Sequence, residues 1–64
     1  MARITKKIKE RIEKGFDILI IKGGKEYFFF KDSEEWTRDI IVDGEIVETD
    51  FFEGEEVLWE IKNI

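Results

Sequence analysis

Large apolar residues crowd residues 15–30, on both sides of the polar segment Lys22-Gly23-Gly24-Lys25. Two adjacent glycines supply the positive φ angles that a tight turn between antiparallel strands requires. The pattern therefore predicts a β-hairpin with strands at residues 16–22 and 25–31.

The second strand of this hairpin is aromatic on both faces. Because side chains alternate along a strand, Tyr27 and Phe29 share one face, and Phe28 and Phe30 share the other. A chain of about 60 residues buries only ~60% of its unfolded surface, too little to fill a core on both faces. We therefore expect one aromatic pair to face solvent or to lie beneath a covering element.

Residues 4–14 fit two interpretations. Ile4, Ile8 and Ile12 are spaced four apart, which gives a narrow apolar stripe on a helix, and Thr5 and the glycine after the segment suit its two ends. The same isoleucines would also share one face of a strand. The capping residues favour a short N-terminal helix, and the strand remains the alternative.

A second hairpin is predicted over residues 38–48, because Asp43-Gly44 is a strong turn signal between two apolar runs. Residues 55–62 alternate between apolar and charged side chains, as in a half-buried antiparallel strand. The residues of this last strand expected to face the core are Val57, Trp59 and Ile61.

Two connections carry aromatic residues. Residues 32–36 resemble a single helical turn, and the Trp36 side chain within it is expected to fill the open end of the core. Residues 49–54 are expected to form a loop with Phe51 and Phe52 packed inward. Five short strands joined by tight turns then predict a small antiparallel barrel, OB-like or SH3-like, because closing the sheet removes exposed edges.

Length and composition limit the number of domains and the kinds of chemistry that this chain can perform. Sixty-four residues predict one domain over 1–64, with a basic segment at 1–14 and the barrel at 15–64. The chain has no His and no Cys, and its only serine, Ser33, has no base nearby, so no enzyme activity is expected. No cofactor or metal is expected, since the acidic clusters lack the ligand spacing of a calcium loop.

The apolar runs are too short for a membrane span of ~18 residues, and the N-terminus lacks the apolar core of a signal peptide. We therefore expect a cytoplasmic protein without membrane contact. Abundant Lys, Glu and Ile with no Pro is typical of a hyperthermophile protein or a designed sequence, and indicates a thermostable chain.

Charge is unevenly distributed along this acidic chain, whose net charge is −5. Residues 1–14 hold six basic and two acidic residues, whereas residues 39–60 hold nine acidic residues and no basic one. Either the basic segment lies against the acidic body, or it meets phosphates or an acidic partner.

Exposed aromatic rings on neighbouring strands form a platform on which single-stranded bases can stack, with Lys or Arg holding the backbone. The predicted nucleic-acid-binding residues are Phe16, Phe28 and Phe30 for stacking, and Lys14, Lys25 and Lys31 for phosphate contact.

Three segments carry a resemblance to cold-shock domains. Residues 14–20, K-G-F-D-I-L-I, resemble the K-G-F-G-F-I element of that family, and residues 25–32, K-E-Y-F-F-F-K-D, resemble its D-V-F-V-H-F-S element. Residues 51–61 are similar to a strand near the end of those domains. The resemblance implies an OB-type barrel that binds single-stranded RNA or DNA, with Phe30 at the position of a family histidine. Asp17 departs from the pattern, since it replaces a glycine on the implied binding face.

Two functional hypotheses follow. The first is a non-catalytic module that binds single-stranded RNA or DNA through the aromatic hairpin. The alternative is a protein-interaction module, or a stable and possibly designed scaffold, whose acidic surface meets a basic protein partner or which associates with itself.

Overall fold

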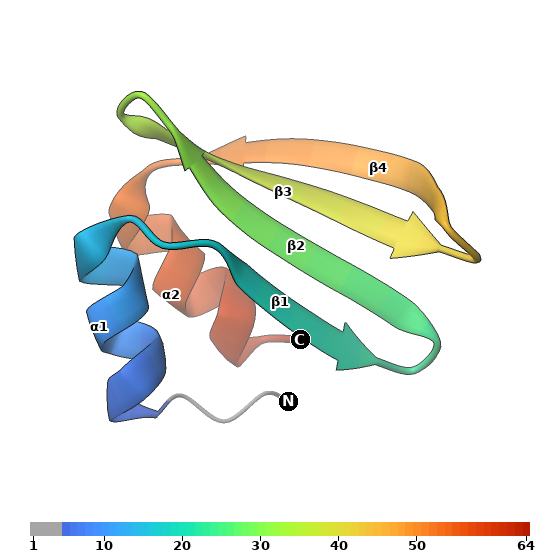
Figure 1. Ribbon diagram of the computed structural model, residues 1–64, viewed down its shortest axis with the longest axis horizontal. Coiled ribbons are helices and arrows are strands. Elements are labelled where there is room, and N and C mark those ends of the chain that lie inside the picture. Colours follow the sequence, from blue (N-terminus) through green and yellow to red (C-terminus); the bar gives the residue numbers. More distant parts are fainter. Residues whose placement is uncertain (1–4) are drawn as a thin grey trace.

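The computed structural model describes residues 5–64 and contains a four-stranded sheet and two helices (Figure 1). In chain order the elements are α1 (Lys6–Lys14), β1 (Ile18–Lys22), β2 (Lys25–Asp32), β3 (Glu35–Val42), β4 (Glu45–Phe52) and α2 (Gly54–Lys62).

The sheet is an antiparallel meander in the order β1-β2-β3-β4, so each strand pairs with its neighbour in sequence. The prediction of a mainly β chain is confirmed. The predicted five-stranded barrel is wrong, because the sheet has four strands and does not close. Strands β1 and β4 are its two edges, and a bulge between Ile40 and Ile41 shifts the register of β3 against β4.

Helix α1 confirms the helical interpretation of the N-terminal segment over the residues that the structure describes; Ile4 lies outside them. The Thr5 side chain accepts a hydrogen bond from the Ile8 backbone N–H at 3.2 Å and so caps the start of the helix. Gly15 ends it in the left-handed conformation, with φ of 76°. Ile8 and Ile12 pack against the core.

Tight turns join all four strands. Gly23-Gly24 and Asp43-Gly44 adopt positive φ, as the sequence predicts. The helical turn predicted at residues 32–36 is wrong, because Ser33 adopts a φ of 61° and Asp32 pairs directly with Glu35. Trp36 therefore belongs to β3, where it is buried in the core as expected.

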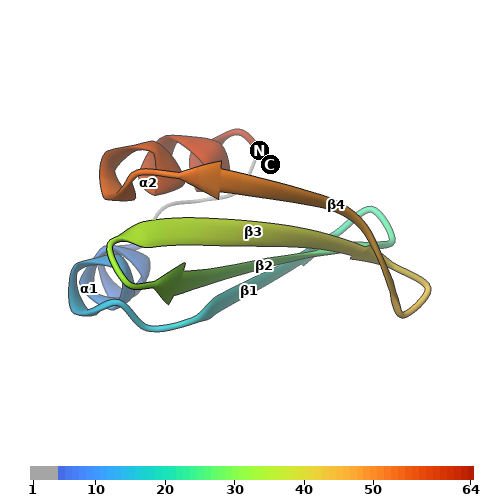
Figure 2. The same cartoon turned by 90° about the horizontal axis from the view of Figure 1, so that it is seen from above.

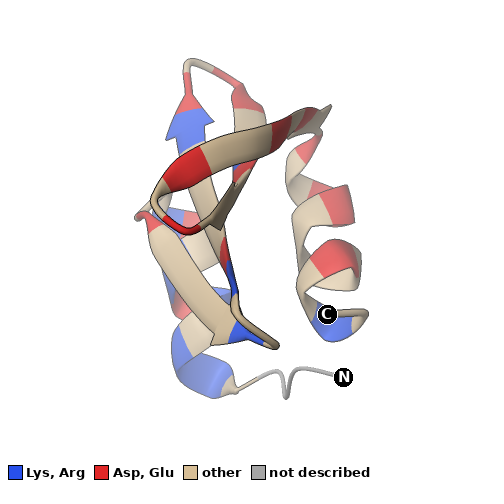
Figure 3. Cartoon of the chain, turned by 90° about the vertical axis from the view of Figure 1, so that its right-hand side faces the viewer, with Lys and Arg blue, Asp and Glu red and all other residues tan. Residues whose placement is uncertain are grey.

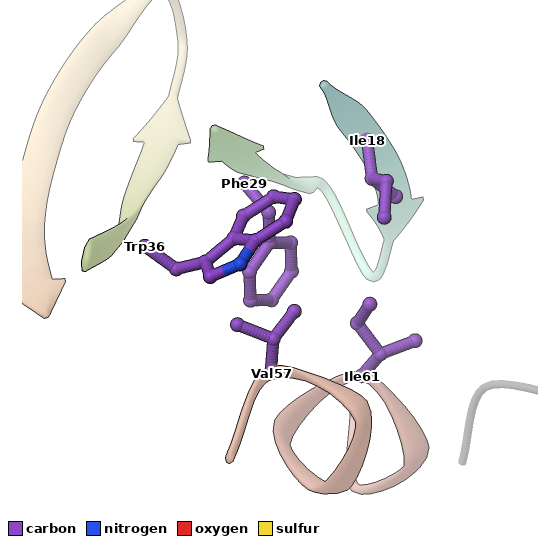
Figure 4. Packing of buried hydrophobic residues seen from close by; sticks show 5 residues of the cluster. All are labelled: Ile18, Phe29, Trp36, Val57 and Ile61. Carbon is purple, nitrogen blue, oxygen red and sulfur yellow. The ribbon is translucent and has the colours of Figure 1, made fainter. Parts of the chain in front are cut away.

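Residues 54–62 form α2, and the strand predicted at 55–62 is wrong. Val57 and Ile61 lie four apart, so they share one helical face as readily as one strand face. Both are fully buried against Phe29 and Trp36 (Figure 4). Trp59, which the strand would have buried, is 63% exposed.

The core lies between one face of the sheet and the two helices. Its buried centre consists of Ile18, Phe29, Trp36, Val57 and Ile61. We call this side of the sheet the inner face; Figure 2 shows α2 alongside it. β4 extends to Phe52, so most of the loop predicted at 49–54 is strand. Phe52 packs against the core as expected, whereas Phe51 is 62% exposed and does not.

Within the described residues, neither helix has the length and apolar character needed to cross a membrane.

Candidate functional site

The side of the sheet opposite the helices forms an apolar surface, which we call the open face. Strand register places its residues in cross-strand rows. Leu19 pairs with Phe28, and Thr37 of β3 lies between Phe30 and Phe51. The row nearest the β1–β2 turn consists of Ile21, Glu26, Ile41 and Ile46. The large apolar residues of the open face are Leu19, Ile21, Phe28, Phe30, Ile41, Ile46 and Phe51.

Most of these side chains are well exposed. Leu19, Ile21, Ile46 and Phe51 each expose more than half of their surface. The rings of Phe28 and Phe30 are half-buried beside one another, with centroids 5.3 Å apart and planes tilted by 33°. Large apolar side chains gathered on one exposed face of a sheet are typical of a surface that binds another molecule.

The charges on the open face are all acidic. Alternation along β2 and β3 places four carboxylates there: Glu26, Asp32, Glu35 and Asp39. The Thr49 hydroxyl donates a hydrogen bond to Asp39 Oδ1 at 2.9 Å. The basic residues of the strands all occupy inner-face positions: Lys22, Lys25, Lys31 and Arg38. Exposed apolar side chains with carboxylates among them therefore suit a ligand that is apolar and basic.

Arg38 connects the inner face to α2. Its Nη2 donates to Asp50 Oδ2 at 2.6 Å, and its Nη1 donates to Glu60 Oε1 at 2.7 Å. The guanidinium also lies 4.9 Å from the centre of the Phe52 ring. Burial alone lowers the pKa of Arg38, but the hydrogen bonds and charges of Asp50 and Glu60 outweigh it and leave the pKa raised. This network fixes the helix on the sheet and leaves Arg38 Nε buried without a hydrogen-bond partner in the part of the chain that the structure describes.

The structure brings together only part of the predicted nucleic-acid site. Phe28 and Phe30 are neighbours on the open face, as expected. Phe16 lies outside β1, in the connection after α1, and Lys25 lies beside the β1–β2 turn. Stacking on Phe16, Phe28 and Phe30 together therefore lacks the common face that it requires.

Phe16 instead lies beside the C-terminal part of α1. Together with Lys7, Glu10, Arg11 and Lys14, it lines a shallow hollow of about 170 Å³. Lys31 also reaches this end of the helix, since a Cβ added to Gly15 would come within 3.3 Å of Lys31 Cδ.

Helix α1 and the acidic stretch 39–60 are not joined by ion pairs. Within residues 5–64, the ion pairs that form are those of Arg38 with Glu48, Asp50 and Glu60. Figure 3 shows basic positions on α1 and acidic positions along α2. Arg11 Nη1 donates to the Asp17 backbone carbonyl at 3.4 Å, whereas the lysines of α1 form no ion pair within these residues and can meet an external group.

Sequence reasoning missed most of the open face. Leu19, Ile21, Ile41 and Ile46 were assigned to strands but not to a site, and Phe51 was placed inside. The alternation of Phe28 and Phe30 with buried Phe29 was the available signal. To extend this face to the neighbouring strands, the strand register must be known. The register depends on the turn at Ser33 and on the bulge between β3 and β4.

Among the described residues, no group of three or more acidic side chains is arranged to hold a metal ion. No protein-family model matches the chain, and neither a curated protein nor a solved structure matches it significantly. The resemblance to cold-shock domains therefore gains no support from these comparisons.

Proposed function

We propose that this chain is a non-catalytic protein-interaction module whose open face binds a short apolar and basic segment of another protein. The observation that carries the proposal is the open face itself, where exposed apolar side chains lie among four carboxylates. A sheet normally buries such a face against another layer, and here the helices occupy only the other side.

Charge favours a protein ligand over a nucleic acid on this face. Phosphate affinity needs local Lys or Arg, and none of the strand residues on the open face is basic. The carboxylates of Glu26 and Asp39 lie next to Phe28 along and across the strands, so they would repel a phosphate backbone stacked there.

Charge also favours a different protein over a second copy of this chain. Packing two open faces together would bring eight carboxylates into one interface without a basic strand residue to balance them. Like charges in an interface cost several kcal/mol. A partner segment with Lys or Arg beside its apolar residues would bury the same rings and neutralise the carboxylates.

Peptide selection tests this proposal. Immobilised protein is screened against a phage library of random peptides about twelve residues long. We expect the recovered peptides to combine aromatic or aliphatic residues with Lys or Arg. Phe28→Ser should weaken their binding at least tenfold, because each buried aromatic contributes on the order of 1.5–3 kcal/mol. Asp39→Asn should weaken it less.

The control is Trp59→Ser, which removes an aromatic residue that is 63% exposed on α2, away from the open face. Peptide binding should survive this change. Selection of acidic peptides, failure to select any peptide, or equal loss with Trp59→Ser would contradict the proposal. Sedimentation velocity tests whether the open face binds a second copy of this chain. We expect a monomer at micromolar concentration. A dimer that Phe28→Ser abolishes would show that the partner is this chain itself and not a different protein.

A further inference from the structure

A second surface, separate from the open face, lies on the solvent side of α1. Lys7, Arg11 and Lys14 are spaced four and three apart, so they share one face of the helix. All three are exposed, and α1 carries five basic residues against two acidic ones. The isoleucine stripe of the same helix is turned into the core, which leaves this basic face to solvent.

Phe16 stands at the end of this basic row in a fixed position. The Phe16 backbone N–H donates to the Arg11 carbonyl at 2.9 Å, and the Gly15 N–H donates to the Ile12 carbonyl at 3.1 Å. These two hydrogen bonds form a Schellman motif, which holds the residue after the helix cap. Phe16 is 54% exposed although its backbone is held, so stacking a flat ligand on its ring costs little conformational entropy.

We infer that Lys7, Arg11, Lys14 and Phe16 form a binding site for single-stranded nucleic acid. The three basic side chains contact successive phosphates along about 10 Å of helix, and the Phe16 ring stacks on one base. Glu10 lines the same hollow, between Lys7 and Lys14, and Asp17 follows Phe16 in the chain. These two carboxylates limit the affinity of the site for phosphate. A lipid surface fits less well, because the apolar stripe that would enter a membrane is packed in the core.

The test is fluorescence anisotropy of a labelled oligo-dT, about twelve nucleotides long, at several salt concentrations. Three phosphate contacts predict a slope of about −2 for the logarithm of the association constant against that of the salt concentration. Lys14→Gln should reduce this slope by about 0.7. Phe16→Ala should weaken binding about five- to tenfold without changing the slope.

Two controls locate the site. Lys25→Gln makes the same charge change at the exposed β1–β2 turn, and Phe28→Ala removes an aromatic ring from the open face; neither should alter binding. Far-UV circular dichroism confirms that each variant is folded. The inference is overturned if the wild-type protein does not bind at low salt or if Lys25→Gln weakens binding as much as Lys14→Gln. It is also overturned if Phe16→Ala has no effect, because the helix would then be a site for any polyanion.

Discussion

Arg38 joins three elements that lie apart in the sequence. From the middle of β3 it contacts Asp50 on β4, Glu60 on α2 and the Phe52 ring. In the sequence it is the last basic residue before residues 39–60, which contain nine acidic residues. Their spacing along the chain does not show which of these carboxylates Arg38 contacts. Its partners follow from the β3–β4 register and from the position of α2, neither of which the sequence pattern resolves.

Replacing Arg38 with Met should destabilise the fold by about 2 kcal/mol, because Asp50 and Glu60 would lose the cation that balances them. This figure is below that of a fully buried pair, since both carboxylates are partly exposed. Arg38→Lys should cost less, as it keeps the charge and loses the forked hydrogen bonds. Urea unfolding followed by tryptophan fluorescence measures both values.

The pH dependence of this network has a definite sign. A raised pKa in the folded protein gives stabilisation that is complete below the normal pKa of arginine and is lost only above it. The stability difference between wild type and Arg38→Met should therefore stay constant from about pH 6 to about pH 10. A difference that falls steadily across this range would contradict the role given to Arg38.

At the scale of elements, α2 shows how an alternating pattern can be misread. Val57, Trp59 and Ile61 alternate as in a strand, while Val57 and Ile61 also match a helical repeat. The Glu residues in its first turn and Lys62 in its last suit the helix dipole. The side chain of Trp59 distinguishes the two structures, because only a strand would bury it.

Ile61→Ala should destabilise the protein by about 3 kcal/mol, because Ile61 is fully buried against the sheet. Trp59→Ala should change stability by less than about 0.5 kcal/mol. The free energy of unfolding from urea titration measures both. A strand at this position would reverse the order, with the tryptophan variant the more damaging of the two.

Local signals predicted the elements whose ends are fixed by particular residues. Thr5 and Gly15 define α1, and the Gly23-Gly24 and Asp43-Gly44 turns define two of the three hairpins. The third turn was missed because Ser33 adopts a left-handed conformation that a serine rarely takes. That error moved Trp36 out of β3, whereas the strand predicted at 55–62 in place of α2 produced the strand count of five.

At the scale of the whole molecule, replacing the fifth strand with a helix changes what the sheet can do. A closed barrel would have had no free edges. The open sheet buries one face under both helices and leaves the other in water. The sequence correctly paired Phe28 with Phe30, but their neighbours Leu19, Ile21 and Phe51 come from other strands and emerge only from the assembled sheet.

The two proposed sites lie on different parts of this architecture and carry opposite charge. The open face is apolar with acidic groups, and the outer side of α1 is basic with one aromatic ring. A variant at Phe28 should therefore affect peptide binding alone, and a variant at Phe16 should affect oligonucleotide binding alone. Loss of both activities in either variant would show that the two surfaces are not independent.

The open face as a binding surface is tested most directly by a two-dimensional ¹H–¹⁵N NMR titration with a peptide recovered from the selection. We predict that the largest amide shifts fall on the open face of the sheet, at Leu19, Phe28, Thr37 and Phe51, and that the Trp59 amide on α2 stays unchanged. Shifts that cluster on the helices and leave these strand residues unchanged would contradict the account.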